Sequence, residues 1–264
     1  MLPVSLELAH LRVVLVRTRN PLNIGAVARA MSNFGFHHLR VVNPYEVAFR
    51  QARSAVGASA LLANAEVYGT VDEAVGDCSL VVGTTAVRNR ELHHQLRPIE
   101  YGARLMLKQL ASGPVALLFG SEKAGLSNAD LSHCHWLVRI PTREENISMN
   151  LGQAVAVCLY ELARDSQIKS THLSEKAKSQ KSRKSQGLDS HQPAPMVEVE
   201  RITSVLFDVL RATRYWNPGA GAATEVKVRR LVRRLNIPVG DAEVWLGILR
   251  QILWKIRSGE KSLP

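Results

Sequence analysis

Residues 140–162, IPTREENISMNLGQAVAVCLYEL, connect the end of one predicted strand to a predicted helix. The apolar stretch before them ends at Ile140, and a polar loop follows. From about Met149 onward, apolar residues recur at helical spacing. Ser148 stands directly before this helix and is of a residue type preferred at helix starts, so we predict that it is the N-cap.

Ser148 and Asn150 place two polar side chains at the start of this helix. The first backbone N–H groups of a helix have no partner within it, so such a terminus is suited to hold a polar ligand. A capped helix without further role explains the same residues equally well. The stretch alone leaves both interpretations open.

The first predicted strand covers residues 11–16, LRVVLV, a continuous apolar run typical of a strand buried on both faces. An Asn-Pro turn at Asn20 then predicts the start of a helix, which ends at Gly35. A second strand at residues 39–42 completes a βαβ unit. In open α/β sheets, ligands bind at the carboxyl ends of the strands, where this helix begins.

Arg29 belongs to that helix. At about 100° per residue, it lies well over a quarter turn from the middle of the apolar face, so we predict that it points away from the core. Most arginines in such a position are solvated surface residues. The helix pattern alone therefore assigns Arg29 no chemical role.

Strand patterns recur along the chain, near residues 65–68, 80–82 and 115–119. With a predicted helix at 99–110, they indicate an α/β fold. The strand at 115–119 runs into a loop that begins at Gly120 and reaches Gly125. This loop is not a P-loop, because Leu126 follows Gly125 where that motif requires lysine.

The composition favours a nucleic-acid partner and argues against a metal site. The 264 residues include 34 Lys and Arg against 23 Asp and Glu, a net charge of +11, and such a charge favours a polyanion. Cys78, Cys134 and Cys158 stand far apart without a C-x-x-C pair, which argues against a disulfide framework or a cysteine zinc site. The adjacent His93 and His94 are poorly spaced to share one ion. We expect no metal.

We expect a cytoplasmic protein without signal peptide or membrane anchor. Charged Glu7 and Arg12 interrupt the apolar N-terminal stretch. No apolar run reaches the roughly 18 residues of a membrane span.

The composition changes near residue 166, and this predicts three parts. Residues 1–165 form the α/β domain, 166–195 a basic flexible linker rich in Lys and Ser, and 196–264 a small all-helical domain. The middle predicted helix of the last part concentrates Arg229, Arg230, Arg233 and Arg234. Four arginines within six residues form either an RNA-binding face or a solvated helix surface.

Three segments taken together resemble the ordered motifs of the SPOUT superfamily, TrmH-like branch. They are NIGAVAR from Asn23 to Arg29, LFGSEKAGL at residues 118–126, and Ile140-Pro141 followed by Ser148-Met149-Asn150. The resemblance extends over roughly residues 10 to 164, and the order and spacing of the three motifs make it specific.

The resemblance implies a SPOUT fold, with a largely parallel sheet flanked by helices and a C-terminal trefoil knot. It also implies a homodimer that binds S-adenosylmethionine in the knot loops. The implied activity is 2′-O-methylation of tRNA ribose, at nucleotide 32 of the anticodon loop. The alternatives are methylation of rRNA or of another tRNA position, or an RNA-binding module without catalysis.

The resemblance also assigns residues by position. The implied catalytic residues are Arg29, Ser148 and Asn150. The implied cofactor contacts are Thr84, Thr85, Ala86, Val87, Gly120, Glu122, Ile140, Ile147, Ser148 and Met149. The expected RNA contacts are Arg17, Asn23, Arg29, Arg88, Arg229, Arg230, Arg233 and Arg234.

Arg29 matches the catalytic arginine of the family, so the resemblance implies that it orients a phosphate and stabilises the ribose 2′-alkoxide. A guanidinium hardly deprotonates in proteins, which leaves open the group that takes the 2′-OH proton. Met149 replaces the leucine usual in the third motif, a volume-conserving change. Ala86-Val87-Arg88 stands where relatives have Ala-Arg, so the arginine that meets RNA is also open.

Overall fold

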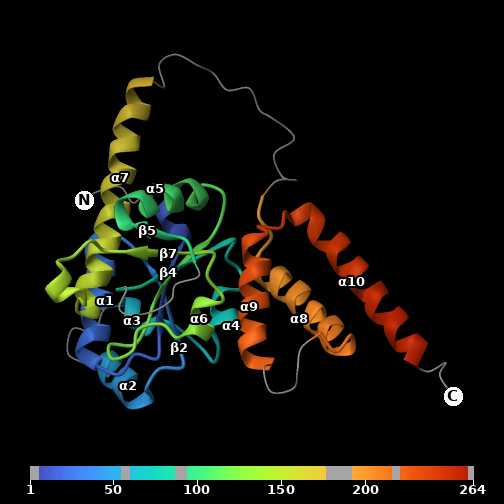
Figure 1. Cartoon of the computed structure of the whole chain (residues 1–264). Helices are drawn as coiled ribbons and strands as arrows, with labels where there is room; N and C mark the ends of the chain where they lie inside the picture. Colours follow the sequence, from blue (N-terminus) through green and yellow to red (C-terminus); the bar gives the residue numbers. More distant parts are fainter. Residues whose placement is uncertain (1–5, 55–59, 87–93, 177–191, 216–220, 261–264) are drawn as a thin grey trace.

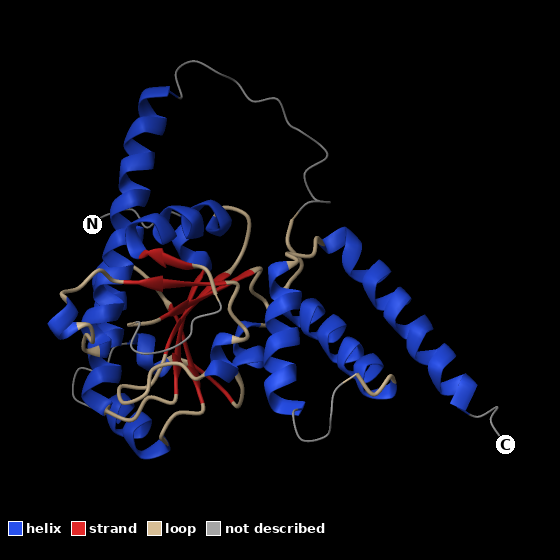
Figure 2. Cartoon of the chain, viewed as in Figure 1, coloured by secondary structure: helices blue, strands red, loops and turns tan. Residues whose placement is uncertain are grey.

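The computed structural model describes residues 6–54, 60–86, 94–176, 192–215 and 221–260. Among them, seven parallel strands form one sheet in the order β3-β2-β1-β6-β4-β7-β5 (Figure 2). The strands are β1 (Leu11–Val16), β2 (His38–Val42), β3 (Glu66–Tyr68), β4 (Leu80–Thr84), β5 (Leu96–Pro98), β6 (Val115–Phe119) and β7 (Trp136–Arg139). This confirms the predicted α/β fold with a parallel sheet, and the trefoil knot stays a prediction.

The sheet is built around β1 and β6, which pair in register from Leu11 with Val115 to Leu15 with Phe119. Nearly every residue of the two strands is buried. Burial on both faces explains why their sequences are continuous apolar runs and do not alternate.

Helices cover both faces of the sheet (Figure 1). Residues of α1, α5 and α7 share one core with one face of the sheet, and residues of α4, α8, α9 and α10 share a second core with the other face. The helices are α1 (Pro21–Phe34), α2 (Glu46–Ser54), α3 (Ala60–Ala63), α4 (Val71–Val75), α5 (Ile99–Leu110), α6 (Asn128–Leu131), α7 (Leu151–Lys176), α8 (Met196–Ala212), α9 (Gly221–Arg234) and α10 (Val239–Glu260), with 3-10 turns η1 (Leu6–His10) and η2 (Glu144–Asn146).

The C-terminal helices dock on the side of α4, as Figure 1 shows. The backbone N–H of Met196 donates to the carbonyl of Cys78 at 2.9 Å, and that of Val197 donates to Gly76, also at 2.9 Å. Val199 and Ile202 of α8 are buried in the second core. This docking gives the C-terminal helices and the sheet one continuous apolar interior.

Two helix boundaries differ from the prediction. The prediction of Ser148 as N-cap was wrong: α7 begins at Leu151, and the side-chain oxygen of Asn150 accepts hydrogen bonds from the N–H groups of Gly152 (2.9 Å) and Gln153 (3.4 Å). The same helix continues to Lys176, into the stretch predicted as linker. Strand β5 was not predicted.

None of the helices that the structure describes combines the length and the apolar character needed to cross a membrane.

A buried histidine lies where the C-terminal helices meet the sheet. Burial, together with the charges of Arg229 and Arg233, lowers the pKa of His133 to about 4, while Glu200 and Asp72 act in the opposite direction. His133 is 9% exposed, and its Nδ1 has no hydrogen-bond partner within the described part of the chain.

We therefore expect stability to fall as the pH is lowered from about 6.5 to about 4. Over this window the unfolded chain protonates His133 whereas the folded chain does not, so proton uptake favours unfolding. One pKa unit corresponds to about 1.4 kcal/mol, so this residue would contribute on the order of 3 kcal/mol. Denaturant unfolding of the wild type, of His133→Gln and of His37→Gln, which replaces an exposed histidine, measures this. Equal pH profiles for the wild type and His133→Gln would contradict the prediction.

Candidate functional site

A cavity of about 460 Å³ opens at the carboxyl ends of β4, β6 and β7. Its walls are three loops, one after each of these strands, and its apolar floor includes Val138, Leu151 and Cys158. The structure thus brings together most of the predicted cofactor contacts, which line the cavity: Thr84, Thr85, Ala86, Gly120, Glu122, Ile140, Ile147, Ser148 and Met149. Val87 lies outside the described residues.

The loop after β6 closes tightly on itself at Gly120. A Cβ on Gly120 would lie 1.9 Å from the carbonyl carbon of Gly125 and 2.1 Å from the backbone nitrogen of Leu126. Gly125 has a φ of 66°, which favours glycine, and its N–H donates to the carbonyl of Ser121 at 2.8 Å. The glycines therefore shape the cavity wall by letting the backbone approach itself.

Glu122 joins this loop to the loop after β1. Its carboxylate accepts hydrogen bonds from the N–H groups of Arg19 (3.2 Å) and Asn20 (3.1 Å) and from the side-chain amide of Asn23 (3.1 Å). Burial acts to raise the pKa of Glu122, but these hydrogen bonds outweigh it and hold the pKa below its usual value. Glu122 is therefore an ionised link between two loops as well as part of the cavity wall.

Asn23 and Asn150 extend this link to α7. The side-chain amide of Asn150 donates to the side-chain oxygen of Asn23 at 2.9 Å. Asn23 is 9% exposed and uses both ends of its amide within the protein. These bonds hold α1 and α7 to Glu122, and the contact of Asn23 with RNA stays a prediction.

Arg29 lies on the exposed side of α1, as predicted, and its guanidinium makes no ion pair or hydrogen bond with another described residue. It is not among the residues that line the cavity. The helix that carries it begins beside the cavity, where Asn20 accepts a hydrogen bond from the N–H of Leu22 at 2.9 Å.

Arg17, a predicted RNA contact, makes an ion pair within the protein. Its guanidinium forms a two-pronged ion pair with the buried carboxylate of Asp130, with one Nη1–Oδ1 distance of 3.1 Å. The Arg17 side chain is still 40% exposed, so its contact with RNA stays a prediction. Arg88 lies outside the described residues.

The prediction of one basic face on α9 was wrong. Arg233 is 1% exposed and pairs with Glu200 of α8 at 2.5 Å, and Arg229 pairs with the same carboxylate at 3.2 Å. Arg229 also lies 5.3 Å from the centre of the Phe207 ring. The pairing turns two arginines inward, so Leu231 and Leu235 face solvent, with exposures of 49% and 50%. Arg234 is exposed and Arg230 is partly buried.

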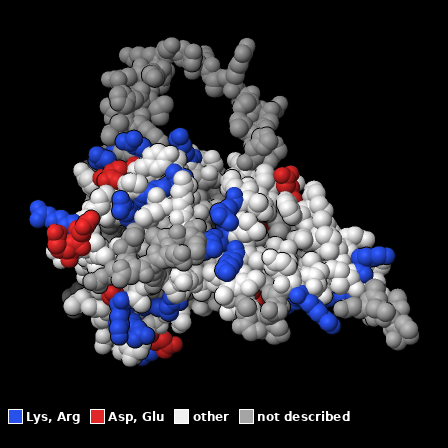
Figure 3. Space-filling view, viewed as in Figure 1, with Lys and Arg blue, Asp and Glu red and all other residues white. Residues whose placement is uncertain are grey.

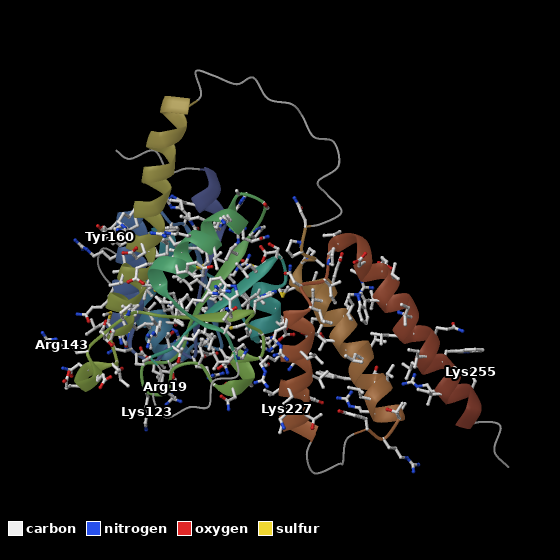
Figure 4. The ribbon with its side chains drawn as sticks, turned by 45° about the horizontal axis from the view of Figure 1, so that its top comes forward. Arg19, Lys123, Arg143, Tyr160, Lys227 and Lys255 are labelled. Carbon is white, nitrogen blue, oxygen red and sulfur yellow. The ribbon has the colours of Figure 1, made fainter. Side chains whose placement is uncertain are left out.

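Basic side chains nevertheless lie on the loops near the cavity, and one of them, Lys123, lines it. Arg19, Lys123 and Arg143 are exposed on the loops that follow β1, β6 and β7 (Figure 4). Figure 3 shows more Lys and Arg than Asp and Glu on the face in view, on both the α/β part and the C-terminal helices. Among the described residues, no group of three or more His, Cys, Asp or Glu is arranged to hold a metal ion.

The sequence profile of the SpoU rRNA Methylase family matches residues 10–160, and the chain belongs to this family. Its curated relatives include proteins named tRNA (cytidine/uridine-2′-O-)-methyltransferase TrmJ. The protein of that name from Klebsiella pneumoniae is 38% identical over 256 residues, which cover 93% of this chain and 97% of the relative. The one from Escherichia coli K12 is 36% identical over 248 residues, which cover 93% and 96%.

Solved structures agree with this assignment. The crystal structure of TrmJ from Z. mobilis ZM4 has a TM-score of 0.74 at 30% identity and covers 91% of this chain and 98% of its own. A probable methylase family protein from Haemophilus influenzae has a TM-score of 0.57 at 27% identity and covers 96% and 99%. These comparisons confirm the predicted resemblance.

Proposed function

We propose that this chain transfers a methyl group from S-adenosylmethionine to a ribose 2′-hydroxyl of tRNA, at nucleotide 32 of the anticodon loop. The observation that carries the proposal is the cavity formed by the loops after β4, β6 and β7, of which the last two carry the second and third motifs. It occurs in a chain that is 38% identical, over 93% of its length, to a protein named as a tRNA 2′-O-methyltransferase. The family's own name makes rRNA the alternative substrate.

The residues around the cavity fit S-adenosylmethionine. The volume of about 460 Å³ lies in the range of small-molecule sites, roughly 300–1,000 Å³. Ile140, Ile147 and Met149 offer apolar surface for a flat base. Gly120 lets the backbone of the cavity wall fold tightly on itself, where a side chain would clash with Gly125 and Leu126. Thr84, Thr85 and Ser148 supply hydroxyl groups for the polar parts of the ligand.

S-adenosylmethionine, when bound, supplies an electrophilic methyl group. The chain's own residues then have to bring a ribose 2′-oxygen to the cavity and favour its alkoxide form. We assign this role to Arg29, whose cationic, exposed guanidinium can grip an RNA phosphate and stabilise negative charge on the 2′-oxygen. Ser148 is exposed at the cavity, and this supports its assignment as a contact to the nucleotide. Asn150 holds the start of α7 against α1 through its hydrogen bond to Asn23.

The proposal includes a division of labour along the chain. Residues 1–165 carry the chemistry, 166–195 connect the parts, and 196–264 add contacts to tRNA. Arg19, Lys123 and Arg143 near the cavity and Lys227 on α9 are exposed cations that suit the phosphate backbone (Figure 4). Of the arginines on α9, Arg234 and the partly buried Arg230 remain candidates for RNA contact.

A homodimer acting in the cytoplasm completes the proposal. Leu22 on α1 is 80% exposed and Tyr160 on α7, labelled in Figure 4, is 51% exposed, so each of these two helices offers apolar surface for a second copy.

We expect S-adenosylmethionine to raise the melting temperature of the protein, because a ligand that binds only the folded state stabilises it by about 2.7 kcal/mol at 100 times its Kd. Calorimetric titration measures the same binding directly, with adenosine triphosphate as a control ligand. The absence of both binding heat and stabilisation at saturating S-adenosylmethionine would overturn the proposed cofactor.

The RNA substrate is tested with matched transcripts. A tRNA transcript should accept a methyl group from labelled S-adenosylmethionine, and the same transcript already methylated on the ribose of nucleotide 32 should accept none. Equal labelling of both transcripts would exclude nucleotide 32, and labelling of an rRNA fragment but of no tRNA would favour the alternative substrate.

A further inference from the structure

The loop after β6 is attached to the loop after β1 at two points. Near its start, Glu122 accepts hydrogen bonds from the backbone N–H groups of Arg19 and Asn20. At its end, Asp130 accepts hydrogen bonds from the N–H and the hydroxyl of Ser127, each at 2.6 Å, and also pairs with Arg17. The stretch between these two carboxylates includes much of one cavity wall.

The attachment through Asp130 is buried on the carboxylate side, while the Arg17 side chain is 40% exposed, and its geometry is defined. The Asp130 side chain is 5% exposed, and each of its two oxygens accepts a hydrogen bond from one nitrogen of the Arg17 guanidinium. Such two-pronged pairs fix orientation as well as distance. Burial acts to raise the pKa of Asp130, but the hydrogen bonds from Arg17 and Ser127 hold it below its usual value, so the carboxylate is ionised at neutral pH.

The backbone conformation of Arg17 is itself well defined. Its φ of 54° lies in the left-handed region, which a residue other than glycine adopts only when its surroundings require it. Its N–H donates to the carbonyl of Val42 at 2.9 Å, at the end of the neighbouring strand. This conformation directs the side chain across β6 to Asp130, while the chain turns toward α1.

We propose that the Arg17–Asp130 ion pair is a positioning element for the cofactor cavity. It holds the loop from Gly120 to Ser127 in its binding geometry before the cofactor arrives. The inference rests on the proposed function and assigns Arg17 a role within the protein in place of a contact with RNA. Neither residue lines the cavity, so both act through the loop.

Loss of the pair should weaken cofactor binding. In Arg17→Gln, the carboxylate of Asp130 is left buried without its partner, and the loop keeps only the attachment at Glu122. Binding must then order the loop, and that ordering reduces affinity. We expect the Kd for S-adenosylmethionine to rise by about tenfold or more.

The experiment compares the wild type, Arg17→Gln, Arg17→Lys, Asp130→Asn and the double variant Arg17→Gln/Asp130→Asn. Calorimetric titration with S-adenosylmethionine well below the melting temperature gives Kd, and a thermal scan without ligand gives stability. Arg17→Lys keeps the charge but loses the planar fork, so its Kd should lie between those of the wild type and Arg17→Gln. The double variant should bind no worse than the weaker single variant, because both changes remove one interaction.

Arg40→Gln is the matched control. Arg40 is 7% exposed and pairs with Asp77, with an Nη2–Oδ2 distance of 3.0 Å, and neither residue lines the cavity. This variant should lose melting temperature and keep the Kd of the wild type within about twofold.

Two results would overturn the inference while the wild type binds cofactor. Arg17→Gln and Asp130→Asn could lose melting temperature with an unchanged Kd, as Arg40→Gln should, and the pair would then be structural only. Alternatively, Arg17→Gln could raise the KM for tRNA at saturating cofactor with an unchanged Kd, which would return Arg17 to the RNA surface. Failure of the wild type to bind S-adenosylmethionine would instead overturn the proposed function, and this inference with it.

Discussion

Arg29→Ala is expected to lower single-turnover methyl transfer by about 100-fold or more, the loss typical for removal of a preorganised charge stabiliser. Arg29 is exposed on α1, outside both apolar cores, so its removal should change stability by no more than about 0.5 kcal/mol. It does not line the cavity, so the Kd for S-adenosylmethionine should stay near that of the wild type. The measurement combines transfer to a tRNA transcript, cofactor titration and a melting curve.

Arg29→Lys and Arg50→Ala sharpen this test. Lysine keeps the positive charge but cannot grip two oxygens at once, so Arg29→Lys should recover only part of the rate. Arg50 is an exposed arginine on α2, and Arg50→Ala should transfer methyl groups at the rate of the wild type. Near-normal transfer by Arg29→Ala would make Arg29 an ordinary surface arginine, and a large loss of melting temperature would make it a structural group.

Gly120→Ala should weaken cofactor binding by about 100-fold. The added Cβ would meet the backbone of Gly125 and Leu126 at 1.9 and 2.1 Å, and backbone atoms cannot rotate away as a side chain does. Overpacking typically costs about 1–3 kcal/mol, and the upper end of that range is about 100-fold in affinity if the loop opens to relieve it.

Gly113→Ala is the control for this substitution, because the nearest atom to its added Cβ is the hydroxyl of Ser79 at 3.7 Å. It should bind S-adenosylmethionine as the wild type does. Calorimetric titration of both variants, with gel-shift binding of tRNA to show that the RNA surface survives, measures the effect. A Gly120→Ala variant with the Kd of the wild type would show that the loop accepts a side chain and that the close backbone approach is dispensable.

The strands that sequence predicts best are those buried on both faces. The predicted bounds of β1 and β6 agree with the structure because a continuous apolar run has no other stable place in an α/β domain. Strand β5 was missed because Leu96-Arg97-Pro98 carries neither an apolar run nor an alternation. It is a strand only because it pairs with β7 at the edge of the sheet.

The cavity was predictable because its walls are short motifs, each contiguous in sequence. Ion pairs between distant residues were not. Glu200 is remote in sequence from Arg229 and Arg233, and nothing near those arginines indicates that a carboxylate turns them inward. The same holds for Arg17, whose partner Asp130 lies far away in sequence, in α6. An exposed basic face was therefore predicted where the structure has a buried ion pair.

The apolar interior that α8 shares with α4 and β4 limits how the chain can diverge. Residues such as Val199 and Ile202 support the sheet as well as their own helix, so a change there is also a change to the enzyme's scaffold. The exposed residues of these helices, Lys227 and Lys255 among them, do not pack in this shared core and can change without affecting the sheet (Figure 4). Adaptation of the C-terminal helices to a different RNA would thus proceed by exchanging surface residues. The inward-facing residues pack against the sheet and can change only together with it.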